Sequence, residues 1–229
     1  MKMKISKIRE SIVRAKLTSP RIVMLSITNS CNLSCRHCLP ESLYYDTTPP
    51  VPADAIKRLI KELCLLGVEE ICLTGGEPLT HPDWLEILSF TCQRQDLNRV
   101  CLQTNATLLT ELDIKSLCSI DSKNLVVQVS LEGSTAETND RVRGTGSFEQ
   151  IIRSLKLLAE AGMGQQVVVA FTEMRHNFMQ LPNLLQFLNE LGIGCLISGT
   201  LIVSGRAGLT NQIAPPTPSQ YRELLNLYH

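Results

Sequence analysis

Apolar, β-branched runs alternate with amphipathic helical patterns along most of the chain. The runs predicted to be strands span 21–28, 70–74, 99–104, 125–131, 166–172 and 194–203. The helical patterns between them span 53–66, 83–95, 110–119, 147–161 and 181–191, and Ser147 is predicted to cap the fourth in a capping box. In the first of these, Ile56, Leu59, Ile60 and Leu63 share one helical face, and Gly67 is placed to end the helix.

The predicted strands are almost continuously apolar, which is typical of a parallel sheet covered on both faces. Six strand–helix units follow one another without a Pro-, Gly- or Ser-rich linker. This order predicts one α/β domain, either barrel-like or an open parallel sheet. Because ligands in such folds bind at the carboxyl ends of the strands, candidate chemistry is sought there.

The two ends of the chain differ from this core, which we place at residues 21–212. Residues 1–20 are basic and lack the apolar stretch of a secretory signal, and Ile5, Ile8 and Ile12 predict a short amphipathic helix. Residues 213–229 begin with a proline-rich turn, after which Ser219 could cap a final helix. The pattern has no helix-ending signal, so it predicts either the start of an extension in a longer protein or a short docking helix.

Composition excludes several classes of protein. The 229 residues contain 22 Lys+Arg, 22 Asp+Glu and 44% hydrophobic residues, which argues against disorder and against a general nucleic-acid binder. The longest uncharged run of the C-terminal half, between Glu190 and Arg206, has 15 residues, fewer than the roughly 20 of a membrane-spanning helix. We therefore expect no nucleic-acid partner and no membrane span.

Nine cysteines, an odd number, cannot all pair as disulfides. Without an export signal, reduced thiols and a cytoplasmic location are expected. Six cysteines are isolated in the sequence, and core packing is the default expectation for them: Cys64, Cys72, Cys92, Cys101, Cys118 and Cys195. A thiol hydrogen donor facing the barrel is the alternative for Cys195.

The other three cysteines form a CxxxCxxC motif directly after the first strand. Cys31, Cys35 and Cys38 are close enough in sequence to hold one inorganic centre. A four-iron cluster normally takes four thiolates, so three leave one iron open to another ligand, as in catalytic metal sites. A structural zinc site with His37 as fourth ligand is an alternative, but His37 is adjacent to Cys38, and neighbouring residues rarely bind one tetrahedral ion together.

A second motif, Gly75-Gly76-Glu77-Pro78, follows the second strand. Two glycines at the carboxyl end of a strand allow a ligand to approach the bare backbone, whose groups can bind an amine. Such residues are common in turns, so the motif is specific only in combination with the cysteines.

With both motifs in this order, the sequence resembles the radical S-adenosylmethionine (radical SAM) family from about Arg21 to Arg206. The resemblance implies a partial (β/α)6 TIM-type barrel and a [4Fe-4S] cluster held by Cys31, Cys35 and Cys38. It also implies that Gly75, Gly76 and Glu77 line the methionyl amine of SAM, which binds the open iron.

A third match narrows the resemblance. Ser130-Leu131-Glu132-Gly133, Asn139 to Gly144 and Gly146-Ser147-Phe148 look like a pattern of the SPASM or Twitch-type subgroup, which includes peptide and sulfatase maturases. By this likeness Ser130 and Arg143 contact SAM, and an arginine fork suits a carboxylate. Glu132 and Asn139 stand where Asp and His are usual, and Ala106 stands where Gly is common. No cysteine follows Cys195, so the cysteine-rich extension of that subgroup is missing.

The resemblance implies the following activity. A reductant such as flavodoxin or ferredoxin supplies one electron, SAM is cleaved reductively, and the 5′-deoxyadenosyl radical abstracts hydrogen from a peptide or protein. Radical generation needs no general base, so no catalytic side chain is assigned. The alternatives are a glycyl-radical-activating or other small-molecule radical SAM enzyme and a non-catalytic iron–sulfur or zinc module.

Overall fold

The computed structural model describes residues 10–15, 20–120 and 123–227. Its main feature is a six-stranded, all-parallel sheet with strand order β1-β4-β5-β6-β7-β8. The strands are β1 Ile22–Ser26, β4 Glu70–Thr74, β5 Arg99–Thr104, β6 Leu125–Ser130, β7 Val167–Glu173 and β8 Cys195–Thr200. Short strands β2 (Ser30–Cys31) and β3 (Leu43–Tyr44) pair separately. The six predicted strands and the α/β barrel-type fold are confirmed.

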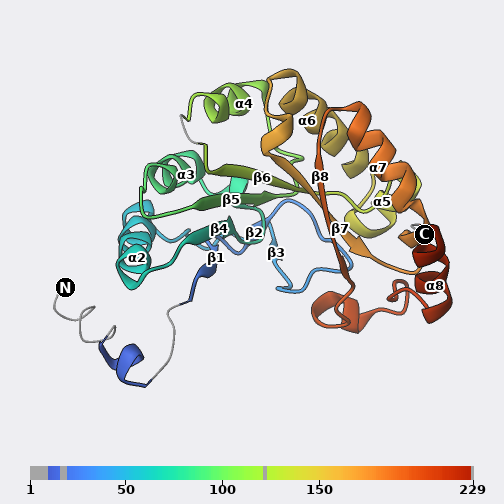
Figure 1. The fold of residues 1–229 in the computed structure, drawn as a ribbon, viewed down its shortest axis with the longest axis horizontal. Helices are drawn as coiled ribbons and strands as arrows, with labels where there is room; N and C mark the ends of the chain where they lie inside the picture. The colour runs from blue at the N-terminus through green and yellow to red at the C-terminus, as the bar shows by residue number, and fades with distance from the viewer. Residues whose placement is uncertain (1–9, 16–19, 121–122, 228–229) are drawn as a thin grey trace.

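Helices cover the outer side of the curved sheet, whereas loops occupy its inner side (Figure 1). The helices are α2 Ala53–Leu66, α3 Trp84–Cys92, α4 Glu111–Cys118, α5 Ala136–Arg143, α6 Ser147–Glu160, α7 Leu181–Glu190 and α8 Pro218–Leu227. As predicted, Gly67 ends α2 in the left-handed conformation, with φ of 93°. Thr110 and Asp113 form a reciprocal capping box at the start of α4.

The hydrophobic core lies between the sheet and these helices. Ile71, Leu73, Val127 and Val129 are fully buried on that side. The opposite face of the sheet is more open, since Met24 on β1 is 65% exposed. The expectation that both faces are covered is therefore wrong for the inner face. Loops rather than packed helices lie over it, which leaves space above the strands.

Two predicted helix caps differ in the structure. Gly146, not Ser147, is the N-cap of α6, because the Ser147 hydroxyl bonds Asp140 instead. Thr217, not Ser219, caps α8, since its hydroxyl accepts a hydrogen bond from the Gln220 N–H. In both cases the expected side chain has another hydroxyl or carboxylate partner.

The isolated cysteines do not all pack in the core. Cys64, Cys72, Cys92 and Cys101 are buried as expected. Cys118 and Cys195 are exposed, so the packing expectation is wrong for these two. Cys195 begins β8, at the end of the strand opposite its carboxyl end, which also argues against it as a hydrogen donor there.

The end segments are only partly described. Ile5 and Ile8 of the predicted N-terminal helix lie outside the described residues, and residues 10–14 form one short helical segment. The segment after residue 212 includes α8, which contacts the short helix Phe178–Gln180. The division into 1–20, 21–212 and 213–229 remains a prediction. In the described part of the chain, no helix combines the length and apolar character required to cross a membrane.

Candidate functional site

A cavity of about 550 Å³ lies at the carboxyl ends of β1, β4, β5 and β6. Every residue that the sequence motifs single out for cluster or SAM binding lines this cavity: Cys31, Cys35, Cys38, Gly75, Gly76, Glu77, Ser130 and Arg143. The parallel sheet explains this convergence, because the loops that follow its strands meet at one edge. The motifs are up to about a hundred residues apart in sequence and share one site in space.

The cysteine loop is held by backbone hydrogen bonds from three directions. The Tyr45 N–H donates to the Cys31 carbonyl at 2.9 Å, the Arg36 N–H donates to the Val142 carbonyl at 2.8 Å, and the Arg206 N–H donates to the Cys38 carbonyl at 3.0 Å. Cys31 and Cys35 are buried and Cys38 is half-buried. Burial raises the pKa of the Cys31 thiol to about 11 and also raises that of Cys35.

Arg206 gives Cys38 a different environment. Its guanidinium donates to the Ser34 hydroxyl at 2.6 Å and to the Ser42 carbonyl at 3.1 Å. Burial alone raises the pKa of the Cys38 thiol, but hydrogen bonds with Arg206 and Ser42 outweigh it and lower the pKa. Sequence reasoning did not select Arg206 as a site residue, although the Gly205-Arg206-Ala207 segment after the sixth strand was its signal.

The donor set fits an iron–sulfur cluster better than a single zinc ion. The three thiols line one cavity, yet among the described residues no three Cys, His, Asp or Glu side chains converge as ligands of one ion. A cluster of iron and sulfide is larger than one ion, so its thiolates stand farther apart. His37 faces Glu132, with Nε2 at 3.4 Å from Oε1, and does not complete a zinc site.

The glycine pair lies directly against the loop that precedes the cysteines. A Cβ at Gly75 would lie 2.4 Å from the Thr28 carbonyl oxygen, and one at Gly76 would lie 2.2 Å from that of Ser30. Gly75 also has φ of +156°. Both positions therefore exclude side chains, and the bare backbone forms part of the cavity wall.

Glu77 is buried, with 1% of its surface exposed. Its carboxylate accepts hydrogen bonds from the Thr104 hydroxyl at 2.6 Å, the Asn105 N–H at 2.6 Å and the Leu79 N–H at 3.2 Å. Burial raises the pKa of Glu77 to about 7, although these hydrogen bonds oppose the shift. Glu77 thus joins the loop after β4 to the loop after β5 as well as lining the cavity.

The loop after β5 has an unusual backbone conformation. Ala106 has φ of 59°, in the left-handed region where glycine is favoured. Its N–H donates to the Thr104 hydroxyl, and its carbonyl accepts a hydrogen bond from Ser154 at 2.7 Å. These contacts hold Ala106 in the left-handed conformation. Glycine adopts this conformation without strain, which is a physical reason for glycine at this position.

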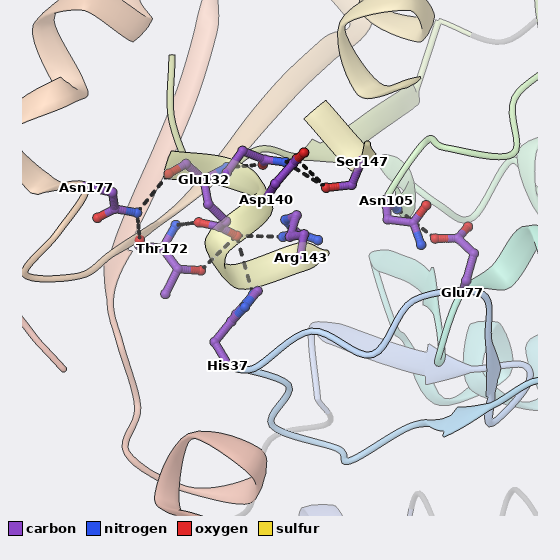
Figure 2. A network of polar contacts seen from close by, with 10 residues as sticks. His37, Glu77, Asn105, Glu132, Asp140, Arg143, Ser147, Thr172 and Asn177 are labelled. Carbon is purple, nitrogen blue, oxygen red and sulfur yellow. Dashed lines mark hydrogen bonds and ion pairs between the residues drawn. The ribbon is translucent and has the colours of Figure 1, made fainter. Parts of the chain in front are cut away.

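Glu132 contacts four segments of the chain, including the cysteine loop through His37 (Figure 2). Its side chain forms a buried ion pair with Arg143 at 2.6 Å and accepts the Thr172 N–H at 2.7 Å. Its backbone carbonyl accepts a hydrogen bond from Asn177 at 3.0 Å. Burial lowers the pKa of His37, the fourth neighbour, to about 4. The Glu132 side chain therefore contacts α5, β7 and the cysteine loop.

Arg143 and His37 still have unused polar atoms. Arg143 Nε and His37 Nδ1 are buried without a hydrogen-bond partner, and both residues line the cavity. Such atoms are costly to leave unpaired, which makes them candidate contacts for a bound polar group. The predicted role of Arg143 as a carboxylate contact is thus compatible with its ion pair.

The Asn139–Gly144 motif and the segment after it form a closed turn. Asn139 accepts the Glu132 N–H at 3.0 Å and donates to the Ser147 hydroxyl at 2.9 Å. Asp140 accepts the N–H groups of Gly146 and Phe148 at 2.7 and 2.8 Å. The Asn139 amide thus supplies both the acceptor for the Glu132 N–H and the donor to the Ser147 hydroxyl. The turn is therefore intact with asparagine where histidine is usual.

Three comparisons with known proteins identify relatives of this chain. The family model described as Radical SAM superfamily matches residues 25–188. The chain is 30% identical over 216 residues to an AdoMet-dependent heme synthase of Methanosarcina barkeri, covering 94% of this chain and 59% of that protein. It is 33% identical over 209 residues to the mycofactocin maturase MftC of Mycobacterium tuberculosis, covering 91% of this chain and 51% of that protein. The chain thus spans little more than half the length of these relatives.

Solved structures support the same fold. SuiB of Streptococcus suis, in its complex with S-adenosylmethionine, superimposes with a TM-score of 0.78 at 20% identity. The match covers 97% of this chain and 51% of that one. The structure of anSMEcpe with bound AdoMet and a Cp18Cys peptide gives a TM-score of 0.63 at 19% identity, covering 79% of this chain and 50% of that one.

Proposed function

The chain belongs to the radical SAM superfamily, and on this premise we propose that it cleaves SAM reductively at a [4Fe-4S] cluster to start radical chemistry on a substrate. One observation carries the proposal: three thiols, a bare glycine pair and an arginine with an unpaired nitrogen line a single cavity. When bound, cluster and SAM together would supply a 5′-deoxyadenosyl radical, which removes hydrogen from a substrate C–H bond.

The residues of the chain would hold and orient these groups. Cys31, Cys35 and Cys38 would bind three irons as thiolates, so cluster assembly must release their protons. The backbone at Gly75 and Gly76 would face the SAM amine, with Glu77 and Ser130 beside it. The unpaired Nε of Arg143 would donate to the SAM carboxylate while its Nη2 stays paired with Glu132.

A peptide or protein is the proposed substrate. The matched relatives include the mycofactocin maturase MftC and the subtilosin biosynthesis protein AlbA of Bacillus subtilis. A structural relative, SuiB, has been solved with its precursor peptide SuiA. These names favour a maturase over a glycyl-radical-activating enzyme.

A porphyrin-type substrate is the second candidate. It is favoured by the match to the heme synthase. That match covers a larger share of this chain and of the matched relative than the match to MftC does. Hydrogen abstraction assays with a deuterium-labelled peptide mixture and with a deuterium-labelled tetrapyrrole would separate the two candidate substrates. Only the true substrate transfers deuterium to 5′-deoxyadenosine.

The proposed partners and location follow from the same chemistry. The cluster requires a one-electron donor such as flavodoxin or ferredoxin. Clustered free thiols require a reducing compartment, so we propose a cytoplasmic location.

Replacement of Cys35 by alanine tests the core of the proposal. We expect Cys35→Ala to lose both the visible absorbance of the reconstituted cluster and the formation of 5′-deoxyadenosine with dithionite. Cys118→Ala is the matched control, because Cys118 is an exposed thiol outside the cavity. Continued 5′-deoxyadenosine formation by Cys35→Ala would contradict the ligand assignment, and retention of zinc instead of iron would favour the metal-module alternative.

A further inference from the structure

The segment after β8 packs directly against the cysteine loop. A Cβ at Gly205 would lie 2.5 Å from the carbonyl oxygens of both Cys38 and Leu39, so only glycine allows this close approach. The next residue, Arg206, donates its backbone N–H to the Cys38 carbonyl at 3.0 Å. The last predicted cluster ligand of the motif is thus attached to a segment far along the chain.

The guanidinium of Arg206 joins the two ends of this loop. Its Nη1 donates to the Ser34 hydroxyl at 2.6 Å, and its Nη2 donates to the Ser42 carbonyl at 3.1 Å. In the sequence, Ser34 precedes and Ser42 follows the pair Cys35 and Cys38. A planar guanidinium can hold two separate acceptors at once, which an ammonium group on a flexible stem does less well. Arg206 therefore fixes the stretch of chain that carries both thiols.

Arg206 also brings a positive charge to the wall of the cavity, which its side chain lines. The guanidinium lies close enough to the Cys38 thiol to hydrogen-bond it. Its Nε is buried without a hydrogen-bond partner, so this donor remains for a group bound in the cavity.

The carboxylates near the cavity do not neutralise this charge at close range. Two of them line the cavity: Glu132 is already paired with Arg143 at 2.6 Å, and Glu77 accepts hydrogen bonds from the end of β5 and the loop after it. Glu41 follows the cysteine motif in the sequence but is exposed, where water and salt screen its charge. Within the described part of the chain, Arg206 forms no ion pair with a carboxylate.

From this geometry we infer that Arg206 is a positioning residue for the cluster: its guanidinium holds the loop of Cys38 in place, and its charge raises the reduction potential of the cluster. The inference rests on the proposed function, in which Cys31, Cys35 and Cys38 bind a [4Fe-4S] cluster. Positive charge and hydrogen-bond donors beside the thiolates favour the reduced form, because it carries one more negative charge. Replacement of residues that orient metal ligands commonly lowers metal affinity by about 10- to 100-fold.

The test measures the reduction potential and the retention of the cluster in the full chain after reconstitution, without SAM or substrate. Arg206→Gln removes the charge, whereas Arg206→Lys keeps the charge but lacks the planar fork. Arg36→Gln is the matched control, because Arg36 carries the same charge between two predicted cluster ligands but is exposed and does not line the cavity. An EPR-monitored titration with dithionite and redox mediators gives the potential, and a coloured ferrous chelator gives the rate of iron release.

We expect one-electron reduction of the cluster to be about tenfold less favourable in Arg206→Gln, which corresponds to a potential about 59 mV lower. Arg206→Lys should keep most of the potential but release iron about tenfold faster than the unmodified chain. Arg36→Gln should change neither quantity, since an exposed charge is screened by water and salt.

An unchanged potential in Arg206→Gln, or an equal decrease in Arg36→Gln, would overturn the effect of Arg206 on the potential. Protein-film voltammetry replaces the titration if Arg206→Gln retains little cluster. Iron release from Arg206→Lys as slow as from the unmodified chain would overturn the positioning role. Failure of the unmodified chain to assemble an EPR-active cluster would instead contradict the proposed function.

Discussion

Single residues determine how closely the backbone loops approach one another at the candidate site. Gly76 is the clearest case, because a Cβ there would overlap the carbonyl oxygens of Ser30 and Asn29 at 2.2 and 2.6 Å. These oxygens belong to the chain just before Cys31. The glycine thus fixes the position of the cysteine loop as well as the predicted amine contact.

We expect Gly76→Ala to weaken SAM binding by about tenfold or more, because the loop before Cys31 must move away. The same displacement should lower the free energy of unfolding by roughly 1–3 kcal/mol. Equilibrium dialysis with SAM and chemical denaturation measure the two effects. Gly194→Ala is the control, since its Cβ would make an ordinary contact of 3.5 Å with Gln165. An unchanged SAM affinity in Gly76→Ala would refute this role.

Glu77 gives the fold a pH dependence of known sign. Its pKa is raised from 4.5 to about 7 by burial, so the folded chain binds this proton more tightly than the unfolded chain does. Its contribution to stability is therefore fully present below the unfolded pKa and is lost as the pH rises through about 7. Between about pH 5 and about pH 8, we expect the unmodified chain to lose roughly 1–3 kcal/mol relative to Glu77→Gln.

Denaturation at several pH values checks this prediction, with the exposed Glu137→Gln as control. A stability difference between the unmodified chain and Glu77→Gln that stays constant with pH would show that Glu77 does not titrate in this range.

Sequence motifs identified eight of the residues that line the cavity but not Arg206, which also lines it, nor the polar contacts that hold the loops. The cysteines, the glycine pair and Arg143 stand in short, spaced patterns, and each follows a predicted strand. Arg206 contacts Ser34 and Ser42 across 172 and 164 residues, respectively, so no local pattern reveals that pairing. The ion pair of Glu132 also depends on how α5 returns over the sheet, which periodicity does not specify.

At the scale of secondary-structure elements, hydrophobic periodicity predicted the order of strands and helices. Which residue caps a helix depended instead on the hydrogen-bond partners of the nearby hydroxyl groups. Ser147 was a reasonable cap by pattern, yet Asp140 and Asn139 bind its hydroxyl. Cys118 and Cys195 show the same limit for burial, because residue type alone does not tell which face of a helix or strand is covered.

Helix α8 is packed onto the core through Tyr221. The tyrosine hydroxyl donates to Glu173 at 3.0 Å, and its ring contacts Phe178 edge to face at 4.8 Å between centroids. We expect Tyr221→Ala to lower the free energy of unfolding by roughly 1–3 kcal/mol. Leu225→Ala on the same helix should change it little, since Leu225 is 59% exposed. Equal effects of the two substitutions in urea denaturation would argue against α8 as part of the folded unit.

At the scale of the whole molecule, one sheet separates two environments. Its outer face packs against the helices, whereas its inner face opens to the loops that carry the candidate site (Figure 1). Parallel strand order explains why the chemistry collects at one edge. The sequence pattern predicted this edge, but the openness of the inner face followed only from the structure.

Cluster assembly should therefore stabilise one region of the molecule. We expect hydrogen exchange to slow in residues 29–45 and 204–209 after reconstitution, because the thiols and Arg206 link these loops. Residues 53–66 of α2 should exchange at unchanged rates. Mass spectrometry of protein with and without cluster measures this, and uniform protection of the whole chain would contradict a local effect.

The two thiols outside the core, Cys118 and Cys195, have a practical consequence for handling the protein. Oxygen that damages an iron–sulfur centre also oxidises accessible thiols, so aerated samples should form covalent dimers and larger species on non-reducing gels. Serine at both positions would remove this crosslinking without altering the cavity wall.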